Sequence, residues 1–304
     1  MKREEEKDPQ EEYFIEKIKK SGYPLEIEVS NLLDRDNYYV SNTHYYFDAE
    51  TNEGRDIDIY GVPISMPILE LGEKLAPLGL RTELAIECKK SESYAWFFYT
   101  RPRLPHSVYM RGQLRTSVPT PTRFSIDSFQ WKLQNECLSP HYDSFDRIAV
   151  AYDEIKKAKL EKKTGENKRS DSSGRKEIFE AKNQLVKFTC YEIHETFKRI
   201  SKLPKDSPKR ELIIVMFPII VVDGDVFEVS FDCGEPKLER KDHLLLLTNY
   251  RCPYCLEVES YTIEIVHRSY FGTFLKTLGE YFQVVREKML ENKEELLKKA
   301  TIQG

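Results

Sequence analysis

Two segments of the sequence decide the fold: RDIDI at residues 55–59 and ELAIECKK at residues 83–90. Each mixes apolar and charged residues in alternation. This pattern is typical of strands, because alternate residues of a strand lie on the same face of a sheet. In the first segment, the two aspartates are therefore expected on one face and the two isoleucines on the other. In the second, Glu87 and Lys89 are expected to share a face. If the two strands are neighbours, the carboxylates and the ammonium converge.

The converging charges predict a metal site. Carboxylates that crowd together repel one another and protonate unless a cation lies among them, and hard oxygen ligands of this kind suit Mg²⁺ or Mn²⁺. Asp58 and Glu87 are the expected metal ligands. Lys89 is expected to orient or help deprotonate a water and to stabilise charge on a phosphate oxygen. The alternative is a solvated strand face on which Asp and Lys form ordinary surface pairs.

The two segments resemble the PD-(D/E)XK nuclease superfamily, which has the restriction endonuclease-like fold, and more narrowly its Mrr-like and Holliday-junction-resolvase-like branches. In that superfamily, one strand supplies a metal-binding Asp and the next supplies Glu-x-Lys behind an apolar run. The matching residues here are Asp58, Glu87 and Lys89, while Asp56 stands where the family more often has Glu and is expected to play a supporting part. The resemblance implies a metal-dependent endonuclease that hydrolyses phosphodiester bonds, with DNA as the expected substrate.

Two further residues match the family by position and complete the expected catalytic set. Glu26 lies on the flank of the apolar stripe of a helix over residues 24–34, and the family often places a Glu on its first helix. Gln184 lies in a helix that follows the Glu-x-Lys strand, where many members carry a Gln. The alternatives are an acid that favours the helix dipole for Glu26 and a solvated helix face for Gln184. Together the matches span about residues 13–190.

Periodicity along the rest of the chain predicts one α/β domain, a mixed central sheet flanked by helices, with inserted segments and a long C-terminal helix. The expected helices cover residues 13–20, 24–34, 177–200 and 271–299, and the expected strands cover 38–47, 55–62, 81–90, 211–222, 226–231, 243–247 and 260–267. An Asp-Gly turn at residues 223–224 is expected to join a strand buried on both faces to a hairpin partner. The expected core is about 13–283, with insertions at about 63–80 and 96–176.

Charge and composition limit the partners. The 304 residues include 47 Lys and Arg against 51 Asp and Glu, a net charge of −4, which argues against coating of nucleic acid by bulk electrostatics. A local basic tract between Glu92 and Asp127 has no acidic residue, and its arginines are expected to hold nucleic acid backbone. These nucleic-acid-binding candidates are Arg101, Arg103, Arg111, Arg115 and Arg123. The alternative is a proline-stiffened surface loop whose arginines serve solubility.

The six cysteines, with no apolar run of membrane-spanning length and a charged start to the sequence, predict a reducing, cytoplasmic location and no membrane partner. The motif Cys252-Pro253-Tyr254-Cys255 has three interpretations. It matches the active-site tetrapeptide of glutaredoxins. It is also half of a zinc site that His243 or His267 would complete, or a tight turn between strands.

A second class of function stays open from the sequence. The chain is either a working nuclease or a nuclease-like fold kept as a module that binds nucleic acid or a protein partner, with catalysis weak or lost. Net acidity favours the second, and the intact Asp and Glu-x-Lys set favours the first. Nucleases of this resemblance commonly act as dimers, so a homodimer is a possible assembly, with the C-terminal helix as a possible partner surface.

Overall fold

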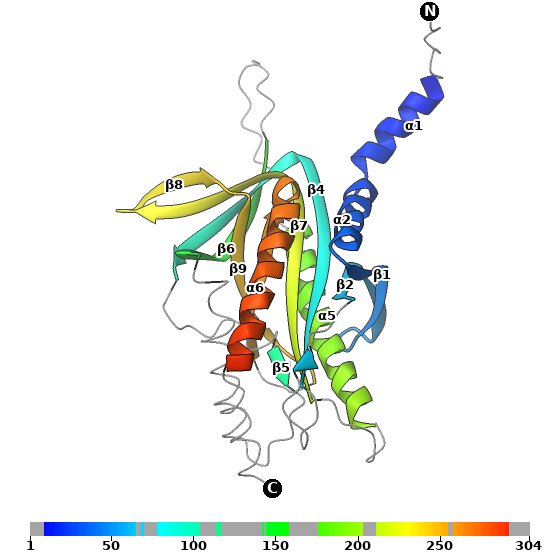
Figure 1. Ribbon diagram of the computed structural model, residues 1–304. Helices are drawn as coiled ribbons and strands as arrows, with labels where there is room; N and C mark the ends of the chain where they lie inside the picture. Colours follow the sequence, from blue (N-terminus) through cyan, green and yellow to red (C-terminus); the bar gives the residue numbers. More distant parts are fainter. Residues whose placement is uncertain are drawn as a thin grey trace, which may run out of the picture.

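The computed structural model describes residues 9–64, 68–69, 78–103, 114–116, 142, 144–157, 176–202, 211–254 and 258–291 (Figure 1). The helices are α1 (Pro9–Lys20), α2 (Tyr23–Arg35), α5 (Lys176–Ser201) and α6 (Phe271–Glu291), with a 3-10 helix, η3, at Arg268–Tyr270. The strands are β1 (Tyr38–Asp48), β2 (Glu53–Pro63), β3 (Ile68–Leu69), β4 (Leu78–Pro102), β5 (Leu114–Thr116), β6 (Arg147–Lys156), β7 (Glu211–Asp232), β8 (Glu235–Arg240), β9 (His243–Arg251) and β10 (Val258–His267).

The described strands form one mixed sheet, as the alternation of helices and strands predicts. Its main path runs β1-β2-β4-β6-β9-β10-β7-β5, with β3 paired to β4 and β8 paired to β7. Strands β7 and β10 pair in parallel, as do β4 and β7, whereas β1, β2 and β4 pair antiparallel. The long strand β4 pairs with β2, β6 and β7, so the pairings form a closed circuit through β4, β6, β9, β10 and β7.

Helices cover both faces of the sheet, which explains the continuous apolar run in β7. Helices α2 and α6 pack on one face and α5 packs on the other (Figure 1). Residues of β7 alternate between the two cores: Phe217 and Ile219 contact the α2 and α6 side, and Met216 and Ile220 contact the α5 side. All four are fully buried. A strand buried on both faces, as predicted, carries no polar face to water.

The predicted Asp-Gly turn is wrong, because β7 continues through residues 223–224 to Asp232 without turning. A Cβ at Gly224 would lie 2.7 Å from the carbonyl oxygen of Ser91 and 2.7 Å from the ring of Trp96. Glycine is therefore needed here for the close approach of β4. The hairpin comes later, where Cys233 (φ 51°) and Gly234 (φ 91°) take the two left-handed positions that a tight turn into β8 requires.

Part of the segment expected as an insertion belongs to the sheet. Strand β4 runs on to Pro102 and pairs with β6. Trp96 and Phe98 are fully buried in the core on the α5 side, and Ile148 of β6 is buried on the other face. Most of the remaining residues between 104 and 175 lie outside the described part of the chain, as do most of residues 65–77 within the other expected insertion.

The apolar stripe of α6 is used inside the molecule. Phe271, Phe274, Leu275 and Leu278 are buried against the sheet and α2, so this face is not left for a second subunit. The helix is described as far as Glu291, and its predicted end at residue 299 lies outside the described residues. Among the described residues, no helix combines the length and the apolar character that crossing a membrane requires.

Candidate active site

The candidate site forms where β2 and β4 separate. The two strands pair through Ile59 with Ile86 and no further in the direction of Asp58. At this point the strict alternation predicted for residues 55–59 is wrong: Ile57 packs in the core on the α5 side, and Ile59 packs in the core on the α2 side. On β1, Thr43 lies opposite Asp58, and these two residues do not pair although the residues on either side of them do. Thr43 also has a φ of 53°, so both strands change direction here.

The separation brings three predicted residues together. The Asp58 side chain reaches β4, where its Oδ2 accepts a hydrogen bond of 2.8 Å from the backbone N–H of Cys88. Lys89 Nζ lies 2.7 Å from Glu87 Oε2 and 3.9 Å from Asp58 Oδ2. The side chain of Glu87 is 1% exposed, that of Lys89 20% and that of Asp58 27%. The group therefore has a buried carboxylate at its base and two more accessible charges above it.

Burial and neighbouring charges shift the pKa of both Glu87 and Lys89 in this group. Burial raises the pKa of Glu87 to about 7, although the positive charge of Lys89 opposes the shift. Burial alone would lower the pKa of Lys89, but the negative charges of Glu87 and Asp58 outweigh it and raise that pKa. Lys89 is thus an ammonium near neutral pH. An ammonium orients a water and stabilises negative charge, whereas it does not remove a proton.

Two glutamates on helices lie close enough to this group for their pKa to respond to the charge of Lys89. Glu26 of α2 is half-buried, and burial together with the charge of Asp58 raises its pKa while Lys89 opposes that shift. This places the residue with the predicted set. Glu177, in the first turn of α5, was missed by sequence reasoning: desolvation raises its pKa and the charge of Lys89 opposes the change. The only sequence signal for Glu177 is an acid at a helix start, which is common at the positive end of any helix.

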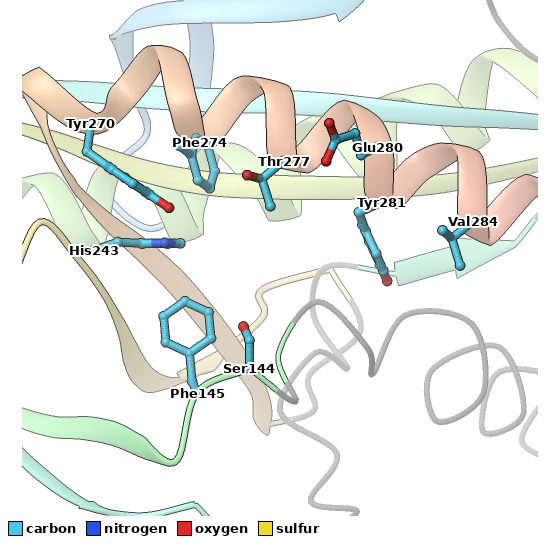
Figure 2. Close-up of a pocket in the computed structure, with 9 residues that line it drawn as sticks. All are labelled: Ser144, Phe145, His243, Tyr270, Phe274, Thr277, Glu280, Tyr281 and Val284. Carbon is cyan, nitrogen blue, oxygen red and sulfur yellow. The ribbon is translucent and has the colours of Figure 1, made fainter.

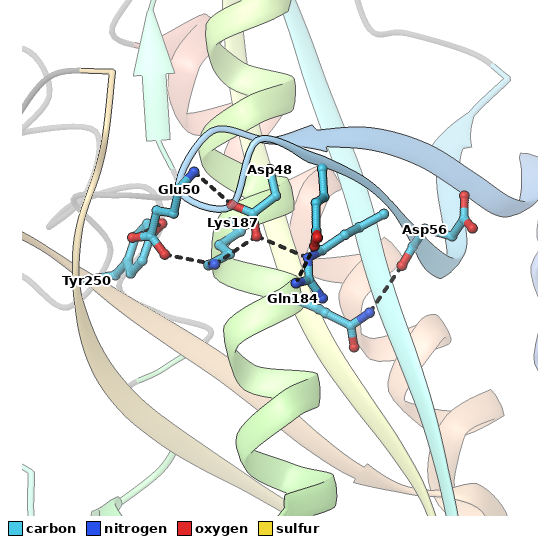
Figure 3. A network of polar contacts seen from close by, with 8 residues as sticks. Asp48, Glu50, Asp56, Gln184, Lys187 and Tyr250 are labelled. Atoms are coloured by element: carbon cyan, nitrogen blue, oxygen red, sulfur yellow. Dashed lines mark hydrogen bonds and ion pairs between the residues drawn. The ribbon is translucent and has the colours of Figure 1, made fainter.

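Gln184 has a different position from the one that the family match implies. Its Nε2 donates a hydrogen bond of 3.2 Å to the backbone oxygen of Asp56 (Figure 3). The side chain of Asp56 itself is exposed. Gln184 therefore ties α5 to the strand that carries Asp58, two residues before that aspartate, and Asp56 takes part through its backbone.

A polar clamp, formed by Asp48, Glu50, Lys187 and Tyr250, holds the turn between β1 and β2 (Figure 3). Lys187 Nζ of α5 lies 2.8 Å from Asp48 Oδ2 and 2.7 Å from Glu50 Oε2. The Tyr250 hydroxyl of β9 donates to Glu50 Oε1 at 2.8 Å. The hydrogen bond from Lys187 lowers the pKa of Asp48 despite burial of the carboxylate. Through this clamp and Gln184, α5 holds both ends of the segment that leads to Asp58.

The described residues contain no group of three or more His, Cys, Asp and Glu side chains arranged to hold a metal ion. Mg²⁺ does not need such a group, because it keeps several waters and is commonly bound by one or two carboxylates plus substrate phosphates. Glu87 Oε1 supports the fit: this oxygen is buried and no described residue makes a hydrogen bond of ordinary geometry to it, although the backbone of Asp58 helps to lower the pKa of the carboxylate. A buried acceptor of this kind is costly unless a proton or a cation occupies it. Asp58 and Glu87 are thus suited to a divalent cation.

Of the arginines predicted to grip nucleic acid, Arg101 is not brought to the carboxylates. Arg101 lies near the C-terminal end of β4, beyond a register shift in its parallel pairing with β7. Counted along β7, about 30 Å of strand separates the level of Arg101 from that of Lys89. The backbone N–H of Arg103 donates to the Asp146 carbonyl at 2.8 Å. The structure describes only the backbone of Arg115, within β5, while Arg111 and Arg123 lie outside the described residues.

The zinc interpretation of the CxxC motif that used a histidine is wrong. The register of β9 and β10 places His243 and His267 at the end of this strand pair opposite to Cys252. Cys252 is buried beside Cys190, whose Sγ lies 2.8 Å from the Tyr261 hydroxyl oxygen. Cys255 lies outside the described residues, so the redox interpretation stays a prediction.

A pocket of about 510 Å³ lies apart from the candidate site, between α6 and the segment before β6 (Figure 2). Its described lining includes His243, whose Nε2 lies 2.7 Å from Oε2 of the buried Glu264. The ring of His243 packs edge-on against Phe145 and Phe274. None of the candidate catalytic residues is among the described lining residues, so this pocket is not part of the site at β2 and β4.

A second buried acid on β4 predicts how stability depends on pH. Glu83 is fully buried beside Arg81 and Tyr60, and burial raises its pKa to about 7 although the charge of Arg81 opposes this. Because the folded-state pKa exceeds the ordinary value of 4.5, the folded protein binds this proton more tightly than the unfolded chain does. The free energy of unfolding should therefore fall as pH rises from about 4.5 to 7, by roughly 2–3 kcal/mol from this group.

Glu83→Gln should remove that contribution, so the variant gains stability over the natural protein at pH 8 and not at pH 4.5. Urea unfolding at pH 4.5, 6, 7 and 8 measures the difference, and the exposed Glu239→Gln is the matched control. A Glu83→Gln variant that is less stable than the natural protein at pH 8 would show instead that Arg81 holds Glu83 as an anion.

Comparisons with protein-family models, with curated proteins and with solved structures return no match for this chain. A functional assignment therefore depends on the geometry and chemistry of the site.

Proposed function

We propose that this chain is a Mg²⁺- or Mn²⁺-dependent nuclease of the restriction endonuclease-like type that hydrolyses phosphodiester bonds in DNA. The observation that carries the proposal is the meeting of Asp58, Glu87 and Lys89 at the separation of β2 and β4. Such a set lowers the stability of the fold, because burying a carboxylate with 1% exposure beside other charges costs free energy, and a function would explain why it is kept.

Each residue has a distinct part in the proposed reaction. Asp58 and Glu87 would hold the cation, which polarises a phosphoryl oxygen and lowers the pKa of a bound water. Lys89 orients the attacking water and stabilises the negative charge that develops on the phosphate. Glu26 supplies a further acceptor for that water from α2, and burial raises its pKa, which favours proton uptake by this carboxylate. Gln184 positions the strand that carries Asp58.

A titration of the purified protein with MgCl₂ or MnCl₂ tests the proposal. A cation that binds only the folded state should raise the melting temperature, and cleavage of circular, branched or single-stranded DNA should require that cation. Asp58→Asn should remove both effects while it keeps an oxygen to accept the Cys88 hydrogen bond. If neither cation raises the melting temperature and no DNA is cleaved, the proposal is wrong.

The second candidate is a module of this fold that binds DNA or a protein without cleaving it. Two observations favour it: the net charge of −4 and the distance of Arg101 from the carboxylates. Under this alternative, DNA binding measured by fluorescence anisotropy persists in EDTA and in Asp58→Asn, and no substrate is cleaved. Metal-dependent cleavage by the natural protein excludes this alternative.

A further inference from the structure

Four residues on the α5 side of the sheet form a buried chain of hydrogen bonds. They are Cys252, directly after β9, Cys190 of α5, and Tyr261 and Glu259 of β10. The two thiols hydrogen-bond each other, and Cys190 Sγ lies 2.8 Å from the Tyr261 hydroxyl oxygen. That hydroxyl donates to Glu259 Oε2 at 3.3 Å. Each of the four residues is at most 5% exposed, and the proposed nuclease reaction uses none of them.

The hydrogen bonds of this chain run in one direction. The Tyr261 hydroxyl has a single proton and donates it to Glu259, so the thiol is the donor in its contact with Cys190. The proton of Cys190 is thus directed at Tyr261, and Cys252 is the donor in the contact between the two sulfurs. The chain therefore leads from two thiols to a carboxylate that can take up a proton.

Such a route supplies what a buried thiol lacks. The contact with Cys252 and burial both raise the pKa of Cys190, so this thiol keeps its proton near neutral pH. A cysteine acts as a nucleophile only after it loses that proton, and buried cysteines without a nearby base are inert. Glu259, reached through Tyr261, is a base in the position that activates a nucleophile.

We propose that Cys190 and Cys252 are a dithiol that hydrogen peroxide converts into a disulfide, with Tyr261 and Glu259 taking up the proton of Cys190. Cys252, next to the turn, reacts first: one peroxide oxygen bonds to its sulfur as a sulfenic acid, and the other leaves with the thiol proton as water. The Cys190 sulfur then attacks the Cys252 sulfur while its proton passes through Tyr261 to Glu259.

This second step balances as a disulfide exchange does. The S–S bond forms, the S–O bond breaks, and the hydroxide that leaves becomes water with the proton that Glu259 gives back. Overall, the two thiols lose two electrons and two protons, and one peroxide becomes two waters. The two sulfurs already touch, so side-chain rotation brings them to the S–S bond length of about 2.05 Å.

The disulfide would join the same two elements as the polar clamp. Lys187 lies three residues before Cys190 on α5, and Tyr250 lies two residues before Cys252 on β9 (Figure 3). Oxidation would therefore lock α5 covalently to the end of β9, beside the contacts that hold the turn between β1 and β2. The inference does not depend on nuclease activity, because it uses only the thiols and their hydrogen-bond partners.

Mass spectrometry of the full-length chain tests the proposal. The reduced protein is treated with hydrogen peroxide, alkylated with N-ethylmaleimide and digested without reductant. One linked pair of peptides is expected, with Cys190 joined to Cys252, and dithiothreitol should separate the pair. The melting temperature should rise by roughly 5–10 °C on oxidation, since the disulfide closes a long loop. Cys255→Ser and the exposed Cys233→Ser should form the same disulfide as the natural protein.

The proton route has its own variants. Tyr261→Phe and Glu259→Gln should slow disulfide formation about 10- to 100-fold. In Tyr261→Phe the remaining rate should rise roughly tenfold per pH unit, because hydroxide must then remove the thiol proton, a dependence that a purely structural hydroxyl would not change. Circular dichroism of the reduced variants checks that each is folded.

Three outcomes would overturn the proposal. The first is a disulfide between Cys252 and Cys255, which would favour the glutaredoxin-like interpretation of the motif. The second is alkylation of both Cys190 and Cys252 after peroxide treatment. The third is disulfide formation at the natural rate in both Tyr261→Phe and Glu259→Gln.

Discussion

Replacing Lys89 with methionine is expected to lower the rate of metal-dependent DNA cleavage by roughly 1000-fold, the usual effect of removing a group that stabilises transition-state charge. Lys89 Nζ lies 2.7 Å from Glu87 Oε2 and 3.9 Å from Asp58 Oδ2, and the side chain is 20% exposed. It is therefore close enough to the carboxylates to face a phosphate that a cation bound there would hold. Methionine keeps the length and the apolar stem of the side chain and removes only its charge and donors.

The neighbouring Lys90 gives a matched control. Its Nζ contacts the Lys19 carbonyl and lies 3.5 Å from Asp223 Oδ2, away from Glu87. Lys90→Met should cleave DNA at the natural rate, while Lys89→Arg should retain part of the activity because it keeps the positive charge. Rates are compared at saturating Mg²⁺ with melting temperature as a check of folding. Equal cleavage by the natural protein and Lys89→Met would exclude the proposed role.

The sequence predicted the site well where the strand is regular. Leu84 and Ile86 pack on one face of β4, and Ala85 and Glu87 lie on the other, as strict alternation requires. The same rule failed between Ile57 and Ile59, because a change of strand direction depends on what the neighbouring strands do and leaves no mark in the local pattern. Asp58, Glu87 and Lys89 meet as predicted, but the Asp56 side chain does not join them, and the bend in β2 was not predicted.

Contacts between residues far apart in the sequence explain the other differences. Asp223-Gly224 has the composition of a turn, and only the approach of Ser91 and Trp96 explains why glycine is needed in a continuous strand. The polar clamp likewise joins Lys187 to Asp48, 139 positions away in the sequence, and no local motif predicts such a pair. Propensity and periodicity specify elements, whereas the partners across the sheet specify how those elements bend.

Replacing Glu87 with glutamine should produce two opposite effects: loss of cleavage, by roughly 1000-fold or more, and gain of stability in the absence of metal. The loss follows because an amide is a much weaker ligand for Mg²⁺ than a carboxylate is. The gain follows because this side chain is 1% exposed and its burial raises the pKa to about 7, so the charged form costs free energy at pH 8. Glutamine resembles the neutral acid and avoids roughly 2–3 kcal/mol of that cost.

The two effects of Glu87→Gln separate a catalytic carboxylate from a structural one. Thermal unfolding in EDTA at pH 8 should show a higher melting temperature than the natural protein, and added MgCl₂ should raise the natural protein's melting temperature while leaving the variant's unchanged. If Glu87 instead served only to pair with Lys89, the substitution would break a buried ion pair and destabilise the protein by about 3–5 kcal/mol without any metal dependence. A destabilised variant that still cleaves DNA would therefore assign Glu87 to the fold, whereas a stabilised, inactive variant would mean that the carboxylate is kept for the cation at the expense of stability.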